Sequence, residues 1–227
     1  MNLDVIWDEI EKEQAWREEE IQFFQNFLLK LPKEDDQKKY RRALVLILYA
    51  HFEGFCKYTF AHYIKTINDL QIKCKVANYS LVAAALTEVF TELRDPHRKN
   101  KVFQRSLPDD SLLHRFARDR EFLEKIDELN DRDVSIPEKA IDTDSNLKPE
   151  ILQKILFRLG LPHDKFDNIK DKVHKLLNLR NRIAHGESKD GLSQEEYDSL
   201  RESVFFIMNE VKRDIMESIK NKSYLRI

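Results

Sequence analysis

Hydrophobic residues recur every three or four positions along most of this chain, the spacing that places them on one face of an α-helix. The spacing predicts a first helix over Leu3–Leu31, ended by Pro32, and a second helix from about Gln37 to Ile72. The middle of the second helix is apolar on nearly all sides, so we expect it to be the central helix of the domain. Gly54 within it costs about 1 kcal/mol relative to alanine, which suggests close packing against another helix.

The middle of the chain is more polar. A third helix is predicted over Tyr79–Leu93, but within residues 95–147 only the stretch Ser111–Ile126 has a helical pattern. We therefore expect residues 95–147 to form a polar insertion, or a looser second layer, within a single domain that spans residues 1–227. The helical pattern returns at Lys148–Gly160, with a proline in its first turn and a glycine as its stop.

Two further helices are predicted near the C-terminus. One starts at about Asp167 and stops before Gly186, and the other follows a capping-box signature formed by Ser193 and Glu196. The chain has only four glycines and six prolines, and it contains no alternating strand pattern. The expected fold is all-α: a helical bundle with an up-down core of four to five long helices and a polar, partly helical insertion.

The charge balance excludes an overall basic protein, because the formal net charge is −2. Any site for a polyanion must therefore be local. One candidate surrounds His97, and it could contact the phosphates of a substrate or be an ordinary solvated surface. Its basic residues are Arg94, Arg98, Lys99 and Lys101.

The sequence gives no reason to expect a metal, a cofactor or a membrane. Cys56 and Cys74 are two isolated thiols without clustered histidines, which argues against a zinc site or a disulfide framework. The acidic N-terminus lacks the features of a signal peptide, and the most apolar stretch, Ala43–Ala50, is too short to cross a bilayer. We expect a cytoplasmic protein with reduced cysteines.

Arg180 occupies an unexpected position, because it falls on the apolar seam of its helix, three and four residues from Ile183 and Leu176. Burying an unpaired charge costs several kcal/mol, so Arg180 needs a partner, a water-filled cleft or an interface. His185 follows just before the helix stop, and unwinding at Ala184 would let it turn back toward Arg180. The alternative is an arginine paired with an acidic residue of the central helix, and a histidine that merely caps its own helix.

The segment "RNRIAH", residues 180–185, resembles the R-x4-6-H motif of the HEPN superfamily. The second helix is also similar to that of bacterial HEPN-like nucleases, with its order of tyrosine, aromatic residue, Glu-Gly, aromatic residue and lysine. HEPN domains are small and α-helical, and many are metal-independent endoribonucleases of toxin–antitoxin, phage-defence and CRISPR-associated systems. The resemblance covers the second helix and the last two helices, and it says little about residues 75–147.

The resemblance implies a homodimer that cuts RNA in a cleft where two such motifs face each other. It assigns proton transfer to His185 and contact with the scissile phosphate to Arg180, while Asn181 orients the histidine or contacts the phosphate. Arg182 contacts backbone phosphates or is simply solvated. An antitoxin or another protein could regulate such an enzyme. A non-catalytic HEPN module that binds RNA, a nucleotide or a protein, and a purely structural adaptor, remain alternatives.

Glu53 and Lys57 interrupt the apolar run of the second helix four residues apart. A pair at this spacing contributes only a few tenths of a kcal/mol as an exposed ion pair. Because an E-x3-K pattern accompanies the motif in some HEPN nucleases, we expect Glu53 to pair with Arg180 or His185 and fix its orientation.

Overall fold

The computed structural model describes residues 3–101, 111–143 and 146–226. These residues form α-helices joined by turns and two short 3-10 helices, and their only strand-like pairing is two isolated bridges. The elements are α1 (Leu3–Leu28), α2 (Glu34–Asp69), α3 (Tyr79–Ala85), α4 (Thr87–Arg94), α5 (Ser111–Glu124), α6 (Ile126–Asp131), η1 (Glu138–Ile141), α7 (Pro149–Arg158), η2 (Asp167–Ile169), α8 (Lys170–Ala184) and α9 (Gln194–Lys220). The predicted all-α class is confirmed.

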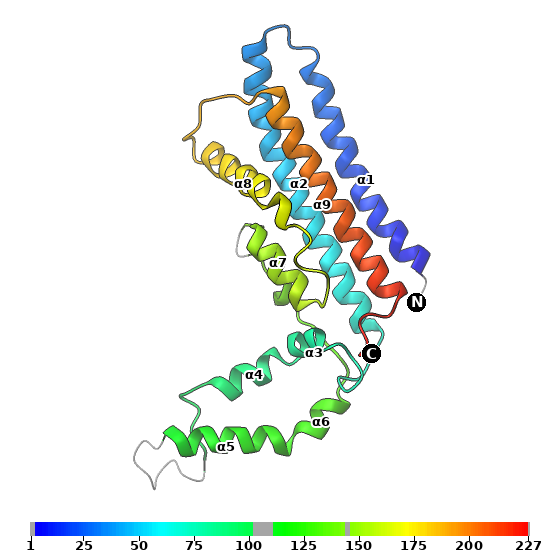
Figure 1. The fold of residues 1–227 in the computed structure, drawn as a ribbon, viewed down its shortest axis with the longest axis vertical. Coiled ribbons are helices and arrows are strands. Elements are labelled where there is room, and N and C mark those ends of the chain that lie inside the picture. Colours follow the sequence, from blue (N-terminus) through cyan, green and yellow to red (C-terminus); the bar gives the residue numbers. More distant parts are fainter. Residues whose placement is uncertain (1–2, 102–110, 144–145, 227) are drawn as a thin grey trace.

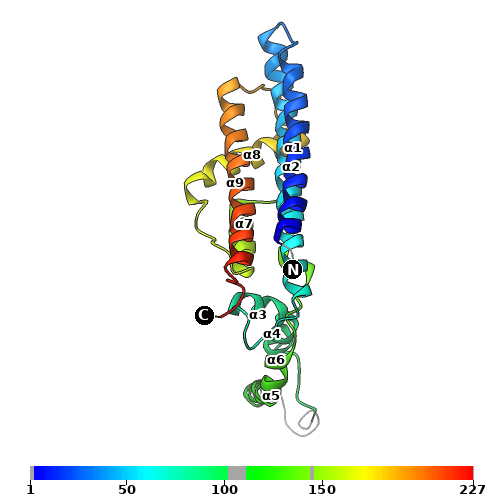
Figure 2. The same ribbon diagram turned by 90° about the vertical axis from the view of Figure 1, so that its right-hand side faces the viewer.

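Three long helices, α1, α2 and α9, run side by side and form the main bundle (Figures 1 and 2). The shorter helix α8 packs against α2 and α9, and α7 packs next to α8. As the uniform hydrophobicity of its sequence predicts, α2 lies at the centre and contacts α1, α8 and α9. Its fully buried side chains include Leu48, Phe52, Phe55 and Ile67.

Gly54 lies where α2 meets α1, and the predicted close approach is confirmed. A Cβ atom at this position would lie 3.0 Å from the Arg17 guanidinium of α1, a separation tighter than ordinary van der Waals contact. That guanidinium pairs with Glu13 of its own helix, so a charged group is accommodated against the backbone of the apolar α2. A larger residue at this position would require the Arg17 guanidinium to shift by a few tenths of an ångström.

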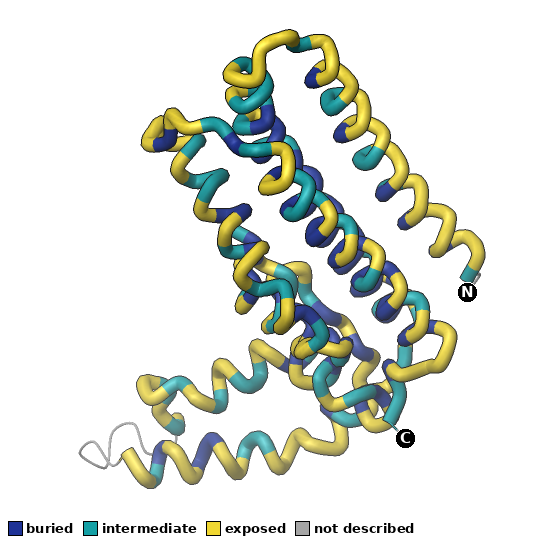
Figure 3. Tube along the Cα trace, turned by 45° about the horizontal axis from the view of Figure 1, so that its top comes forward, coloured by how far each residue is buried: buried dark blue, intermediate teal, exposed yellow. Residues whose placement is uncertain are grey.

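Helices α3 to α6 form an arm that extends beyond the end of the bundle (Figure 1). The single helix expected over Tyr79–Leu93 is instead interrupted at Leu86, which separates α3 from α4. The Thr87 hydroxyl donates to the Ala84 carbonyl at 2.8 Å, and such local side-chain bonds compete with the helical backbone pattern. Much of α5 is exposed, as the tube coloured by burial shows (Figure 3).

The last part of the polar section returns to the bundle. Val134, Ile136 and Leu147 are buried, and η1 packs against α2 and α7. Asn68 of α2 both accepts a hydrogen bond from the Ile136 N–H at 2.8 Å and donates one to the Ile136 carbonyl at 3.1 Å. The segment around Ile136 is thus anchored on the central helix.

The predicted helix signals at the C-terminal end are confirmed. Gly160 adopts a φ of +68° just after α7, in the left-handed region that favours glycine. Ser193 and Glu196 form a complete capping box at the start of α9. In the part of the chain that the structure describes, no helix is long and apolar enough to span a bilayer.

Candidate functional site

Arg180 lies on the face of α8 that packs against α2. The same face carries the buried side chains of Val173, Leu176 and Leu177, so the predicted seam position is confirmed. Arg180 itself is only half-buried, and its guanidinium lies 5.1 Å from the ring centroid of Tyr49 on α2. A cation over an aromatic face stabilises the arginine where a leucine would otherwise continue the core.

Two asparagines orient the Arg180 guanidinium. Its Nη1 donates to Asn146 Oδ1 at 3.0 Å and to Asn181 Oδ1 at 2.8 Å. Among the described residues no carboxylate pairs with Arg180, so the expected alternative of a salt bridge to α2 is not observed. Its Nε and Nη2 have no hydrogen-bond partner in the described ranges, and this edge of the guanidinium can bind two oxygens of a phosphate.

Tyr49 connects Arg180 with the segment that leaves η1. Its side chain is 2% exposed, and its hydroxyl accepts a hydrogen bond from the Leu147 N–H at 2.8 Å. Burial and the nearby Glu53 carboxylate raise the pKa of Tyr49 to about 12, so the phenol is neutral at physiological pH. The tyrosine therefore acts as a fixed support for Arg180 and for residues 146–147.

Glu53 does not make the direct contact that was expected of it. Its carboxylate pairs with Lys57 at 2.9 Å and accepts a hydrogen bond from the Thr143 hydroxyl at 2.9 Å, and no described contact joins it to Arg180 or His185. The prediction was wrong because two nearer donors satisfy this mostly buried carboxylate. Glu53 still lies close enough to Tyr49 to raise its pKa, so it belongs to the surroundings of the site.

His185 is the C-cap residue of α8, directly after Ala184, the last residue of the helix. Gly186 adopts a φ of +72°, and the Glu187 N–H donates to the Arg182 carbonyl at 2.8 Å, which closes the helix in a Schellman motif. The His185 side chain is exposed and contacts no hydrogen-bonding partner among the described residues. No hydrogen bond in the described ranges joins it to Arg180, so the expected pairing of the two side chains is not observed, and the helix continues to Ala184 without unwinding.

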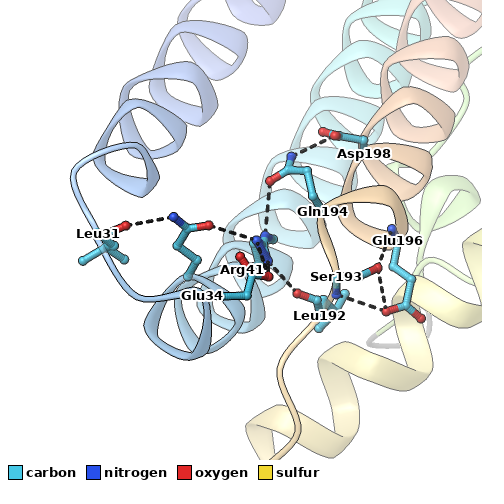
Figure 4. A network of polar contacts seen from close by, with 9 residues as sticks. Leu31, Glu34, Arg41, Leu192, Ser193, Gln194, Glu196 and Asp198 are labelled. Carbon is cyan, nitrogen blue, oxygen red and sulfur yellow. Dashed lines mark hydrogen bonds and ion pairs between the residues drawn. The ribbon is translucent and has the colours of Figure 1, made fainter.

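The loop after His185 is fixed by a buried arginine that sequence reasoning missed (Figure 4). Arg41 of α2 is 2% exposed, and it donates to the Leu192 carbonyl at 2.9 Å and to Gln194 Oε1 at 3.2 Å. It also pairs with Glu34 at 3.1 Å, so its charge is balanced. The signal was the pair of arginines, Arg41 and Arg42, that precedes the apolar run of the second helix.

The basic residues near His97 lie on the arm rather than beside Arg180 (Figure 1). Arg98 pairs with Glu92 at 3.3 Å and with Glu121 at 2.8 Å, which balances its charge. Arg94 stacks over the Phe90 ring at 5.6 Å, and Lys99 and Lys101 are exposed. The structure does not bring this cluster together with the Arg180 region.

The fold and the motif together define an all-α domain in which Arg180 of α8 packs against Tyr49 of the central helix α2, and His185 caps the same helix α8. A comparison with protein families matches residues 6–224 to the family described as "HEPN_MAE_28990-like HEPN", and the chain belongs to this family. No curated protein and no solved structure matches the chain. The suggested kinship with the HEPN superfamily is therefore confirmed, and the roles of individual residues remain predictions.

Proposed function

We propose that this protein is a metal-independent endoribonuclease of a toxin or phage-defence system, acting as a homodimer. The main support is the state of Arg180. Its Nη1 is fixed by Asn146 and Asn181, while its other nitrogens have no partner among the described residues. A guanidinium oriented in this way fits a phosphodiester, and it lies five residues before an exposed histidine.

The chemistry follows from RNA itself. The 2′-hydroxyl attacks the adjacent phosphorus and loses its proton to a base, and the 5′-oxygen leaves as it gains a proton from an acid. The products are a 2′,3′-cyclic phosphate and a 5′-hydroxyl end. Arg180 would stabilise the added negative charge on the phosphorane, and an exposed histidine can serve as acid or base near neutral pH.

The motif holds one histidine, His185, whereas the reaction needs both a base and an acid. A second copy related by a two-fold axis would supply the other histidine, with one acting as base and the other as acid. Arg182 is exposed beside the motif and could contact flanking phosphates in such a cleft. Lys57, which pairs with Glu53, would contribute only through the surroundings of Tyr49.

The decisive experiment incubates the purified protein with total RNA in the presence of a chelator. We expect cleavage with 2′,3′-cyclic phosphate ends, and its loss in His185→Ala and Arg180→Ala. His174→Ala is a matched control, because this partly exposed histidine lies on the same helix and bonds to Glu150 at 2.9 Å. Cleavage that survives in His185→Ala, or that falls equally in the control, contradicts the proposal.

A separate experiment tests whether one active site needs a histidine from each of two subunits. In it, wild-type and His185→Ala subunits are mixed in equal amounts during refolding. If both histidines of a dimer are required, about a quarter of the wild-type activity remains, because only pairs of wild-type subunits are active. If each subunit carries a complete site, about half remains. The second value would exclude the composite site while leaving the nuclease activity itself intact.

A non-catalytic HEPN module is the second candidate, and it is favoured because no hydrogen bond in the described ranges joins His185 to Arg180. It predicts RNA binding that survives in His185→Ala, without cleavage at any protein concentration. Growth arrest on expression in a bacterial host would separate the two candidates further, since a toxin arrests growth only with Arg180 and His185 both present. An antitoxin would be recognised as a protein that restores growth.

A further inference from the structure

A cavity of about 600 Å³ lies between α3, η1 and α7, away from the Arg180 guanidinium. Figure 1 shows where α3 and α7 approach each other near the base of the bundle. This volume lies within the range of small-molecule sites, roughly 300–1,000 Å³. The walls are mostly apolar and include Tyr79, Ala83, Thr87, Pro137, Ala140 and Phe157.

Two of the wall residues are aromatic side chains that remain largely exposed. Tyr79 is 72% exposed and Phe157 is 59% exposed, although both line a concave surface. Each ring is held from one side: the Arg226 guanidinium lies 4.1 Å from the Tyr79 ring centroid, and the His163 ring lies 5.1 Å from that of Phe157. Rings held in this way offer preformed contacts for another planar ring.

The two charged residues that line the cavity, Lys139 and Arg158, are both basic. Lys139 pairs with Glu88 at 3.1 Å, and Arg226 donates to the Ala77 carbonyl at 2.8 Å. Arg158, by contrast, pairs with no carboxylate in the described ranges, and its only bond is a long one, 3.5 Å, to the Ala140 carbonyl. An exposed guanidinium at the edge of an apolar cavity complements a ligand that carries an anionic group.

We propose that this cavity binds a small aromatic molecule with one anionic group. The ring would lie against Tyr79 and Phe157, and the anion would bind Arg158. A carboxylate or a phosphate ester has the chemistry that Arg158 requires, whereas a neutral ring would leave the guanidinium without a partner. This assignment is independent of RNA cleavage, because none of the cavity residues belongs to the Arg180 motif.

A ligand in the cavity would contact the segment that supports the candidate nuclease site. Pro137, Lys139 and Ala140 line the cavity, and the same segment continues to Thr143, which donates to Glu53, and to Asn146, which accepts from Arg180.

The test measures binding to the full chain by isothermal titration calorimetry with three probes of the same ring: 1-naphthoate, 1-naphthyl phosphate and the neutral 1-naphthalenemethanol. We expect saturable binding of at least one anion, about tenfold tighter than that of the neutral alcohol. The tighter of the two anions identifies the carboxylate or the phosphate as the natural group. Absence of saturable binding, or equal affinity for the neutral alcohol, overturns the proposal.

Variants locate the site. Arg158→Gln should weaken the tighter anion about tenfold and leave the alcohol unchanged, and Phe157→Ala should weaken all binding. Ala83→Trp, which fills the cavity from its exposed wall, should abolish binding and provides an independent check should Phe157→Ala melt early.

Phe116→Ala and Arg120→Gln on the exposed α5 are matched controls that should change nothing. Unchanged binding in both Arg158→Gln and Ala83→Trp would place any observed ligand elsewhere.

His185→Ala separates this proposal from the nuclease proposal. The variant should bind the tighter anion as the wild type does, whether or not the wild type cleaves RNA. Loss of anion binding in His185→Ala would mean that the probe occupies the motif rather than the cavity.

Discussion

Replacing Tyr49 by phenylalanine tests whether the Tyr49 hydroxyl holds the backbone next to Asn146, which in turn orients Arg180. The substitution removes one hydroxyl and keeps the ring, so the packing of α2 and the cation–π contact with Arg180 are retained. It leaves the Leu147 N–H, which now donates to that hydroxyl at 2.8 Å, without an acceptor in a residue that is fully buried.

The expected cost can be worked out from that single change. A buried donor left without a partner destabilises the folded state by about 1–3 kcal/mol. For a chain of this length each kcal/mol lowers the melting temperature by about 2–4 °C. We therefore expect a clear decrease in melting temperature, together with faster hydrogen exchange at the Leu147 amide. Because Asn146 precedes Leu147 and bonds to Arg180, the variant should also cleave RNA more slowly, by about tenfold if the proposed function holds.

Tyr63→Phe provides the matched control. Tyr63 is also buried on α2, and its hydroxyl bonds to Ser218 Oγ at 3.0 Å, so the control loses a comparable hydrogen bond at a distance from the site. It should lower stability without accelerating exchange at Leu147 or slowing cleavage. If Tyr49→Phe changes the free energy of unfolding by less than about 0.5 kcal/mol and leaves exchange at Leu147 unaltered, the inferred role of Tyr49 is refuted.

Three further predictions concern the ends of the helices and the behaviour at high pH. Gly186→Ala should destabilise the protein by about 1–2 kcal/mol in chemical denaturation, since a Cβ meets nothing within 4 Å and the cost comes from the positive φ alone. Ser193→Ala removes the cap of α9 and should cost about 1 kcal/mol by the same assay, whereas Ser193→Asp should retain most of the stability. Burial raises the pKa of Tyr49, Tyr63 and Tyr197 from 10.0 to about 12. Each contributes stability that is complete below pH 10 and lost as the pH rises toward 12, so the free energy of unfolding, measured by chemical denaturation, should fall across that window. A free energy of unfolding that stays constant from pH 10 to pH 12 would contradict this.

The helices could be predicted from the sequence because their signals are local. Apolar spacing located α2 and α9, and Gly160 and Ser193 marked ends that the structure confirms. The interruption at Leu86 was missed because Tyr79–Leu93 keeps a helical spacing across it, and the hydroxyl of Thr87 that competes for the Ala84 carbonyl leaves no trace in that spacing.

The surroundings of the motif were harder to predict because they depend on contacts between distant segments. The position of Arg180 on the seam followed from periodicity, but its bond to Asn146 joins residues 34 positions apart. Glu53 was expected to reach Arg180, because spacing along one helix does not reveal that Thr143 arrives from the polar section to occupy its carboxylate. Arg41 was missed for the same reason, since Leu192, whose carbonyl it binds, is 151 positions away.

Arg180 and His185 differ in how firmly the rest of the chain holds them. The arginine is fixed by two asparagines and a buried tyrosine, whereas the histidine is exposed and, within the described part of the chain, bonds to nothing. A general acid or base must be held within hydrogen-bond reach of the proton that it transfers, and solvent alone does not hold an imidazole in place. If His185 is catalytic, the missing constraint must come from RNA or from a second copy of the chain. His185 should then be protected from diethyl pyrocarbonate at protein concentrations where dimers form, and should react freely on dilution, whereas equal reactivity at all concentrations would remove the second copy as the source of that constraint.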